Sequence, residues 1–320
     1  MVRAELTRVG AGAALLAVLT IGCSDSAPEL PDQPAANGTT AEGAGPETPS
    51  FEQNFVFANV SGDSVFLVPW LTHTMSRPDG VLREAHGWLA RSGTWDAFYS
   101  ERWMTAPSRA PARILPHGDL QLLVGEGDIV DGIIFEDGTR SLELTLGESR
   151  ASWGGPRGET VDLLSGAAFL GDDRVEGVVL HLARAATGGG PPGGDWALLL
   201  SGDSAQFILS ADVEHGGESE PVYRGWAAVG NRTRQWPELH LDWTATQAFP
   251  PARRDVPSSW RLWSGDASVD GELHAISSDM QAGEGTGPLL PVTALFEVVG
   301  EISTADRDYA VHGLVVHQRR

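Results

Sequence analysis

The chain has 320 residues, of which 22 are basic and 43 are acidic, so its formal net charge at pH 7 is −21. Such a charge repels phosphate backbones and anionic lipid surfaces, and nucleic acid is therefore not a predicted partner. Every basic residue is arginine. The absence of lysine excludes G-x-x-x-x-G-K-S/T phosphate loops, Schiff-base chemistry and the Ser-x-x-Lys arrangement of penicillin-binding enzymes.

Residues 1–22 have the pattern of an export signal. Arg3 and Arg8 precede an uncharged run from Val9 to Gly22. As an α-helix this run would cover roughly 21 Å, whereas the hydrocarbon core of a bilayer is about 30 Å thick. The run is therefore short for a membrane span and has the length of a signal-peptide apolar region.

Cys23 is the only cysteine in the chain, so no intrachain disulfide is possible. The preceding residues, Leu19-Thr20-Ile21-Gly22, resemble the box of bacterial lipoproteins, although Thr20 stands where leucine is usual. The resemblance implies lipidation of Cys23 and a membrane partner through that lipid. It also implies a place in the cell envelope, facing the periplasm or the exterior. The alternative is an ordinary cleaved signal followed by an unrelated cysteine.

Residues 23–50 read as a disordered acidic tether. They contain five prolines and five acidic residues, no basic residue and one large apolar side chain, Leu30. Such a segment cannot bury enough apolar surface to offset its chain entropy. The folded body is predicted to span residues 51–320.

The body begins with two predicted strands, Phe55–Phe57 and Val65–Val68, around a turn at Ser61-Gly62-Asp63. A short helix is predicted near residues 80–90, with Asp79 as its N-cap. The apolar residues of this segment fall on one helical face; they are Val81, Leu82, Ala85, Trp88 and Leu89.

The rest of the body reads as strand after strand. Asp137-Gly138 is the strongest hairpin signal, because it supplies the positive φ of a tight turn. The Gly/Pro run at 188–194 is predicted to be a mobile tip or an interlobe hinge. The motif Ser-Gly-Asp-Ser occurs at 61–64 and again at 201–204, which suggests lobes at 51–187 and 195–320. The predicted fold is all-β, with an antiparallel barrel favoured, possibly in two lobes, and a β-sandwich as the runner-up.

Gly93-Thr94-Trp95, directly after the predicted helix, resembles the Gly-x-Trp opening of lipocalins. The length, the lipoprotein start and the strand content resemble the lipocalin-like carotenoid hydratases (AttH-type), which carry two barrel lobes. The resemblance implies that Trp95 plugs the closed end of a barrel that holds a ligand. The catalytic carboxylate of that family has no matching position here, so its role is not transferred.

Two short patterns place a histidine and a carboxylate on one face of a strand. They are His240 with Asp242, and Glu272 with His274. Such a polar row can line a lumen, where it binds a ligand or a metal or acts as acid and base, or it can simply face water. We predict Trp95 and these four residues as ligand-binding residues and the same four as weak catalytic candidates; no metal site and no cofactor are predicted.

Three functions remain open from the sequence. The first is binding of a small, largely apolar ligand in a barrel pocket, suggested by the 11 tryptophans. The second is an enzyme of the hydratase or isomerase type, like the lipocalin-like carotenoid hydratases. The third is a glycan- or protein-binding sandwich, which requires an exposed row of tryptophans.

Overall fold

The computed structural model describes residues 49–62, 64–155, 158–187, 194–202, 205–212 and 222–319. The predicted signal, Cys23, nearly all of the tether and most of the 188–194 run lie outside these residues. Gly45–Arg320 forms one compact unit, and it contains both sheets described below. In the described part of the chain, no helix has the length and apolarity needed to cross a membrane.

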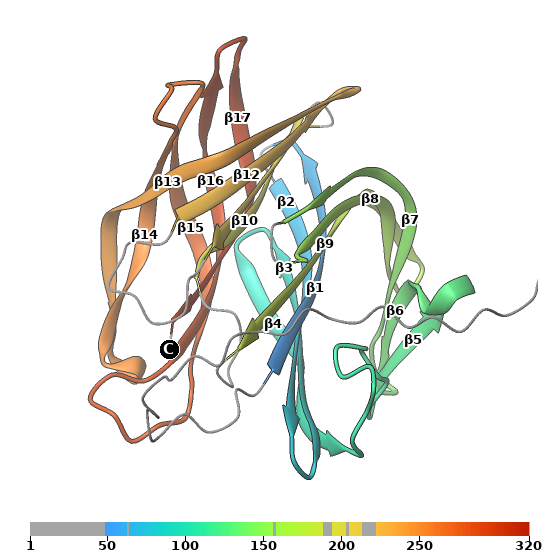
Figure 1. The fold of residues 1–320 in the computed structure, drawn as a ribbon. Helices are drawn as coiled ribbons and strands as arrows, with labels where there is room; N and C mark the ends of the chain where they lie inside the picture. Colours follow the sequence, from blue (N-terminus) through green and yellow to red (C-terminus); the bar gives the residue numbers. More distant parts are fainter. Residues whose placement is uncertain are drawn as a thin grey trace, which may run out of the picture. The chain divides into compact units, whose positions relative to one another are not determined.

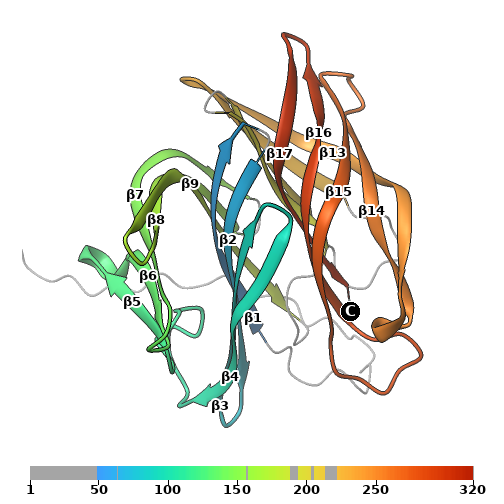
Figure 2. The same ribbon diagram turned by 180° about the vertical axis from the view of Figure 1, so that it is seen from behind.

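The first sheet has nine antiparallel strands in the order β4-β3-β2-β1-β9-β8-β7-β6-β5 and curls without closing (Figures 1 and 2). The strands are β1 (Pro49–Ser61), β2 (Ser64–Arg77), β3 (Gly80–Arg91), β4 (Thr94–Thr105), β5 (Leu120–Val124), β6 (Val130–Glu136), β7 (Ser141–Gly154), β8 (Thr160–Leu170) and β9 (Asp173–Thr187). A single 3₁₀ turn, η1 (Glu126–Asp128), interrupts them.

The second sheet is a closed antiparallel barrel of eight strands. The strands are β10 (Trp196–Ser201), β11 (Ala205–Asp212), β12 (Val222–Val229), β13 (Arg232–Phe249), β14 (Arg254–Trp263), β15 (Val269–Ala282), β16 (Val292–Thr304) and β17 (Asp308–Arg319). The 3₁₀ turn η2 (Pro250–Ala252) joins β13 to β14. Pairing of β10 with β17 closes the barrel. The predicted all-β fold with an antiparallel barrel is confirmed.

The helix predicted near residues 80–90 is wrong, because these residues form strand β3. Arg77 pairs with Gly80, so Pro78 and Asp79 are turn residues and Asp79 caps no helix. Trp88 packs on the barrel side of the sheet, whereas Leu89 packs against the core of its concave side. The apolar residues mimicked a helical face because β3 is buried on both faces.

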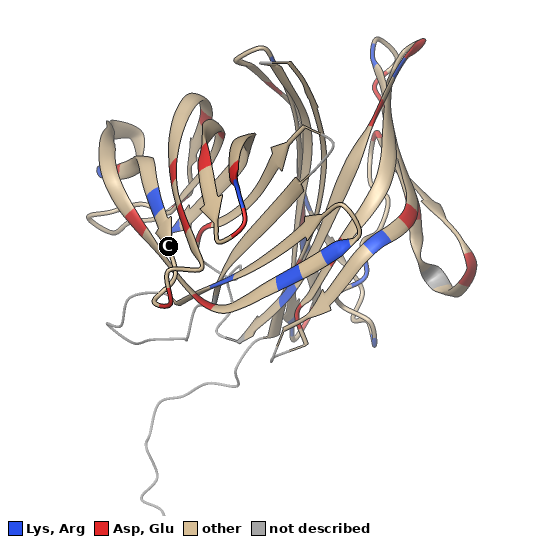
Figure 3. Cartoon of the chain, turned by 90° about the horizontal axis from the view of Figure 1, so that it is seen from above, with Lys and Arg blue, Asp and Glu red and all other residues tan. Residues whose placement is uncertain are grey.

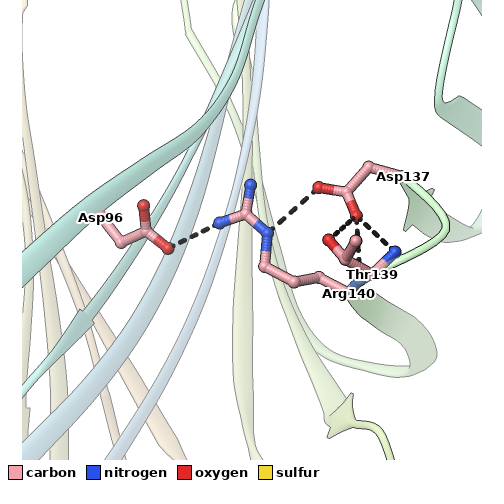
Figure 4. A network of polar contacts seen from close by, with 4 residues as sticks. All are labelled: Asp96, Asp137, Thr139 and Arg140. Atoms are coloured by element: carbon pink, nitrogen blue, oxygen red, sulfur yellow. Dashed lines mark hydrogen bonds and ion pairs between the residues drawn. The ribbon is translucent and has the colours of Figure 1, made fainter.

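Side chains, rather than hydrogen-bonded strands, hold the two arms of the curled sheet together. A bulge in β4 opposite Gly87 and Trp88 leaves Phe98 unpaired. The Phe98 ring lies 4.9 Å from that of Phe135 on β6. Arg140, in the predicted Asp137-Gly138 hairpin, bridges Asp137 at 3.1 Å and Asp96 of β4 at 2.9 Å (Figure 4).

The lumen of the barrel is filled by its own side chains. Its core includes Phe207, Trp236, Trp260, Phe296 and Tyr309, each at most 7% exposed. The outer face of the same barrel shares a second core with the curled sheet. Trp196, Leu198 and Leu314 of the barrel join Leu67 and Trp88 of the sheet in this cluster. Both faces of the barrel wall are therefore apolar along β10 and β17.

Candidate functional site

The four predicted polar site residues lie together on the outer face of the barrel, not in its lumen. Strand β14 lies between β13 and β15, and its Arg261 pairs with both Asp242 and Glu272. Asp242, Glu272 and His274 are exposed, and His240 is half-buried. The lumen receives the alternate residues of β13, among them Leu239 and Leu241. The polar row therefore faces water.

Contacts along this row are those of a solvated sheet surface. The ring of His240 stacks on Trp263 at 3.9 Å, and Trp263 Nε1 donates to Asp242 Oδ2 at 2.7 Å. His274 Nδ1 lies 3.0 Å from Ser259 Oγ. No enclosed wall joins the His240/Asp242 pair to the Glu272/His274 pair in the described structure.

Trp95 has a different place from the one that the lipocalin resemblance implies. Ser92 and Gly93, with φ of 52° and 78°, form the two-residue turn that precedes it. Trp95 then lies on the face of β4 that contacts the barrel, and its Nε1 donates to Ser277 Oγ on β15 at 2.9 Å. It plugs no barrel end; it joins the curled sheet to the barrel.

A second indole makes the same kind of contact. Trp88 Nε1 donates to Asp279 Oδ2 at 2.7 Å. Ser277, the acceptor for Trp95, donates in turn to Glu297 Oε2 at 2.6 Å, and Glu297 is only 3% exposed. Two tryptophans of β3 and β4 are thus hydrogen-bonded to a polar strip on β15 and β16.

Titratable groups continue from Trp88 along the same face of the curled sheet. Register places His73 of β2 opposite Glu84 of β3, and Glu84 opposite Arg102 of β4. Register also places His86 opposite Ser100. We call these residues the contact wall: His73, Glu84, His86, Trp88, Ser100 and Arg102.

Glu84 is the anionic centre of the contact wall. Arg102 Nε lies 3.0 Å from its Oε1, and His73 Nδ1 lies 3.6 Å from its Oε2. The pKa of Glu84 lies below its ordinary value, chiefly through its interaction with His73 and further through the charge of Arg102, although burial opposes this. The Glu84 side chain is therefore an ionised carboxylate at neutral pH. His73 is 8% exposed, and its Nε2 has no hydrogen-bond partner among the described residues.

His86 is the best-placed base of the contact wall. Its Nδ1 lies 3.0 Å from Ser100 Oγ, and its ring stacks on Trp88 at 5.7 Å between centroids. Burial lowers the pKa of His86 from its ordinary value, and the charge of Glu84 opposes that shift. When Nδ1 donates to Ser100, Nε2 is the proton acceptor. The wall therefore presents a neutral, oriented imidazole beside an indole.

Apolar side chains flank this polar cluster on the same face. Leu82 is buried, Met75 is half-buried and Met104 is 45% exposed. The accessible apolar surface here is that of the two methionines, because Trp88 is only 1% exposed; flexible thioether side chains suit adaptable binding surfaces. No group of three potential metal ligands occurs among the described residues.

The sequence does contain a signal for the contact wall. Leu82, Glu84, His86 and Trp88 alternate along the chain, so a strand places all four on one face. The helical interpretation of the same residues hid this pattern. His73 and Arg102 lie on neighbouring strands, and nothing in the local sequence reports their pairing with Glu84.

Comparison with protein-family models gave no match, and comparison with curated proteins gave none either. Solved structures do match. Kievitone hydratase from Nectria haematococca aligns with a TM-score of 0.53 at 10% identity, covering 83% of this chain and 87% of that one. A protein provisionally named AttH, from Nitrosomonas europaea, aligns with a TM-score of 0.56 at 11% identity, covering 90% of this chain and 100% of that one. At such identities the likeness shows the fold, and the expected fold-level resemblance to AttH-type, lipocalin-like proteins is confirmed.

Proposed function

We propose that this is an exported, lipid-anchored protein whose contact wall binds a small, largely apolar ligand carrying a polar group. The observation that carries the proposal is the stacking of His86, held by Ser100, on an indole at the edge of the contact between sheet and barrel. The half-buried Met75 and the exposed Met104 supply apolar surface for the ligand, and His86 supplies a polar contact. Nucleic acid is not a proposed partner, because acidic positions are scattered over both sheets (Figure 3).

The barrel lumen is not the proposed pocket. Its core residues are almost fully buried against one another, so a ligand would have to displace packed aromatic side chains. The contact wall requires no such displacement, because Glu84 and His86 remain partly accessible.

Binding is tested by titrating the purified protein with N-phenylnaphthylamine, a neutral apolar probe, and following tryptophan fluorescence. We expect saturable quenching of the wild-type protein. Trp95→Phe should lower the affinity for the probe, because Trp95 adjoins the contact wall. Trp263→Phe is the matched control on the outer face of the barrel, and we expect it to leave the affinity unchanged. Non-saturable quenching, or equal weakening by both variants, would contradict binding at the wall.

A hydratase or isomerase activity is the second candidate, and His86 favours it. In hydration a base takes one proton from the attacking water as the hydroxyl group adds to one carbon of a double bond, and the protonated base then gives up that proton to the other carbon. A neutral imidazole suits that role, and the ionised Glu84 beside it stabilises the imidazolium that forms. One of the matching folds belongs to a protein named as a hydratase, and this likeness supports a hydratase activity only by analogy.

The activity is tested by mass spectrometry for gain or loss of one water in a panel of apolar alkenes, alcohols and enones. Positioned acid–base groups contribute a factor of roughly 100 or more, so His86→Asn should lower the rate by at least about that much. Glu272→Gln and His274→Asn, on the outer face of the barrel, should leave the rate intact. A full rate in His86→Asn excludes His86 as the base.

The lipid anchor is tested separately, by growing cells with a clickable fatty acid. We expect label on the wild-type protein and none on Cys23→Ser. Label that persists in Cys23→Ser, or no label on the wild type, rules the anchor out and leaves the contact-wall proposal untouched.

A further inference from the structure

A concave site lies in the curled sheet, and none of the contact-wall residues line it. It is a half-open pocket of about 440 Å³ near the turns that join β1 to β2, β3 to β4 and β8 to β9. Its apolar lining includes Phe66, Leu170 and Val175, and Phe66 packs edge-on against the fully buried Phe57. The volume lies at the small end of ligand pockets, which run from roughly 300 to 1,000 Å³, so a short single chain fits better than a two-chain lipid.

An uncompensated cation lies beside this apolar surface. Register places Arg91 directly opposite Phe66, so both side chains lie on the concave side of the sheet. Arg91 lines the pocket, and in the described part of the chain it makes no hydrogen bond, ion pair or ring contact. A guanidinium has five N–H donors in a planar fork that matches a carboxylate.

Among the charged residues described on the rim, Arg91 is the one suited to bind an anion. Arg174 also lines the pocket, but its Nη2 lies 2.7 Å from Glu176 Oε1, so its charge is already compensated. Asp173 is a carboxylate on the same rim and repels an anionic head. Among its described residues, the rim therefore combines one unpaired cation, Arg91, with one opposing charge, Asp173, that can be removed experimentally.

We infer that this pocket binds a short single-chain amphiphile with a carboxylate head, the head on Arg91 and the chain on Phe66, Leu170 and Val175. The inference goes beyond the proposed function, because it uses none of the residues of the contact wall. Apolar burial supplies most of the affinity, and the Arg91 contact selects an acid over the corresponding alcohol.

The test compares decanoate with decanol by isothermal titration calorimetry, both below the concentration at which they aggregate. Arg91→Gln should weaken decanoate binding about three- to tenfold, because the ion pair is only partly desolvated, and should leave decanol binding unchanged. Asp173→Asn should strengthen decanoate binding and leave decanol binding unchanged. Val175→Trp should abolish binding of both by filling the pocket.

Three outcomes overturn the inference. One is an acid-to-alcohol affinity ratio that Arg91→Gln does not change. Another is the absence of saturable binding of either probe to the wild-type protein, and the third comes from a variant of the contact wall. His86→Asn separates the two proposals: loss of decanoate binding in that variant would place the ligand at the contact wall instead, whereas unchanged binding supports a separate pocket.

Discussion

Glu52 and Arg184 form an enclosed ion pair between β1 and β9. Both side chains are 2% exposed, and Arg184 donates to Glu52 Oε2 from Nε at 3.0 Å and from Nη2 at 2.5 Å. Arg184 also reaches Gln318 of β17 at 3.4 Å. The pair therefore lies where β1 and β9 of the curled sheet meet the last strand of the barrel.

Glu52→Gln should be strongly destabilising, because it leaves the charge of Arg184 buried without its counter-ion. We expect the free energy of unfolding, measured by urea denaturation, to fall by about 3–5 kcal/mol. The double variant Glu52→Leu/Arg184→Met should be more stable than Glu52→Gln, because it buries no charge. A single variant within about 1 kcal/mol of wild type would mean that the pair is hydrated, like a surface salt bridge.

His86 gives the contact wall a pH dependence whose sign can be worked out. Burial lowers the pKa of His86 below the ordinary 6.5. Above about pH 6.5 the imidazole is neutral in both folded and unfolded chains, so the shift has no effect on stability. As the pH falls below that value, the unfolded chain takes up the proton first, and the free energy of unfolding decreases toward the lower pKa of the folded state.

His86→Asn should remove this contribution. We expect the unfolding free energy of the wild type minus that of the variant to decrease as the pH falls from about 7 to about 5, because only the wild type loses stability through His86. Urea denaturation at each pH measures this difference. Other groups whose pKa is lowered, such as Asp162, are present in both proteins and largely cancel in the difference. If the unfolding free energies of the two proteins change with pH in parallel, then burial does not lower the pKa of His86.

At the scale of single residues, the predicted polar row of His240, Asp242, Glu272 and His274 lies on the outer face of the barrel and not in its lumen. The alternation of His240 and Asp242 with leucines indicates two faces of a strand, but only the closed sheet decides which face is the lumen. The apolar residues took the lumen because burying them is favourable, whereas the polar row keeps its hydration outside.

Turn chemistry explains which elements could be predicted from the chain. The predicted Asp137-Gly138 hairpin is confirmed, because Glu136 pairs with Ser141 and Gly138 adopts a positive φ of 80°. The Arg77-Pro78-Asp79-Gly80 turn has an equally clear signature, which favours a hairpin into β3 over a helix capped by Asp79. The bulge at Phe98 has no local sequence signal, because it depends on which strand pairs with β4.

Strand β17 closes the barrel against β10, and a glycine makes that close approach possible. A Cβ atom at Gly313 would lie 2.0 Å from the carbonyl oxygen of Leu198. Gly313→Ala should therefore force the two strands apart and lower the free energy of unfolding by about 1–3 kcal/mol. Calorimetric melting curves measure the effect.

Gly265→Ala is the matched control for this substitution. No heavy atom lies within 4 Å of the Cβ position at Gly265, and its φ is not positive. We expect a change within about 0.5 kcal/mol, as for an ordinary surface position. If the two variants have the same melting temperature, β17 and β10 have room for a methyl group at Gly313, and the close approach does not require glycine.

For the molecule as a whole, the shared core is the feature that local sequence could not report. Val56, Leu67 and Leu180 of the curled sheet pack in one cluster with Leu198 and Leu314 of the barrel. Strands of both sheets read as continuous apolar runs for this reason, as buried strands do. The sequence therefore predicted a β-rich body, but it could not predict which faces meet.

The repeated Ser-Gly-Asp-Ser motif has a consistent place in the two sheets. Ser61 pairs with Ser64, and Ser201 pairs with Ala205, so each copy connects the first two strands of its sheet. One sheet closes with eight strands, and the other curls open with nine. Duplication of an ancestral lobe stays a prediction, because the same tetrapeptide is also ordinary turn chemistry.

Photoaffinity labelling tests the location of the ligand site most directly. The protein is irradiated with a neutral alkyl diazirine at a concentration that gives saturable fluorescence quenching, and the labelled peptides are mapped by mass spectrometry. We predict label within residues 82–88 of β3, 100–104 of β4 and 277–281 of β15 that an excess of N-phenylnaphthylamine suppresses. Competed label confined to residues 240–242 and 272–274, or to 61–66 and 170–175, would contradict a ligand site at the contact wall.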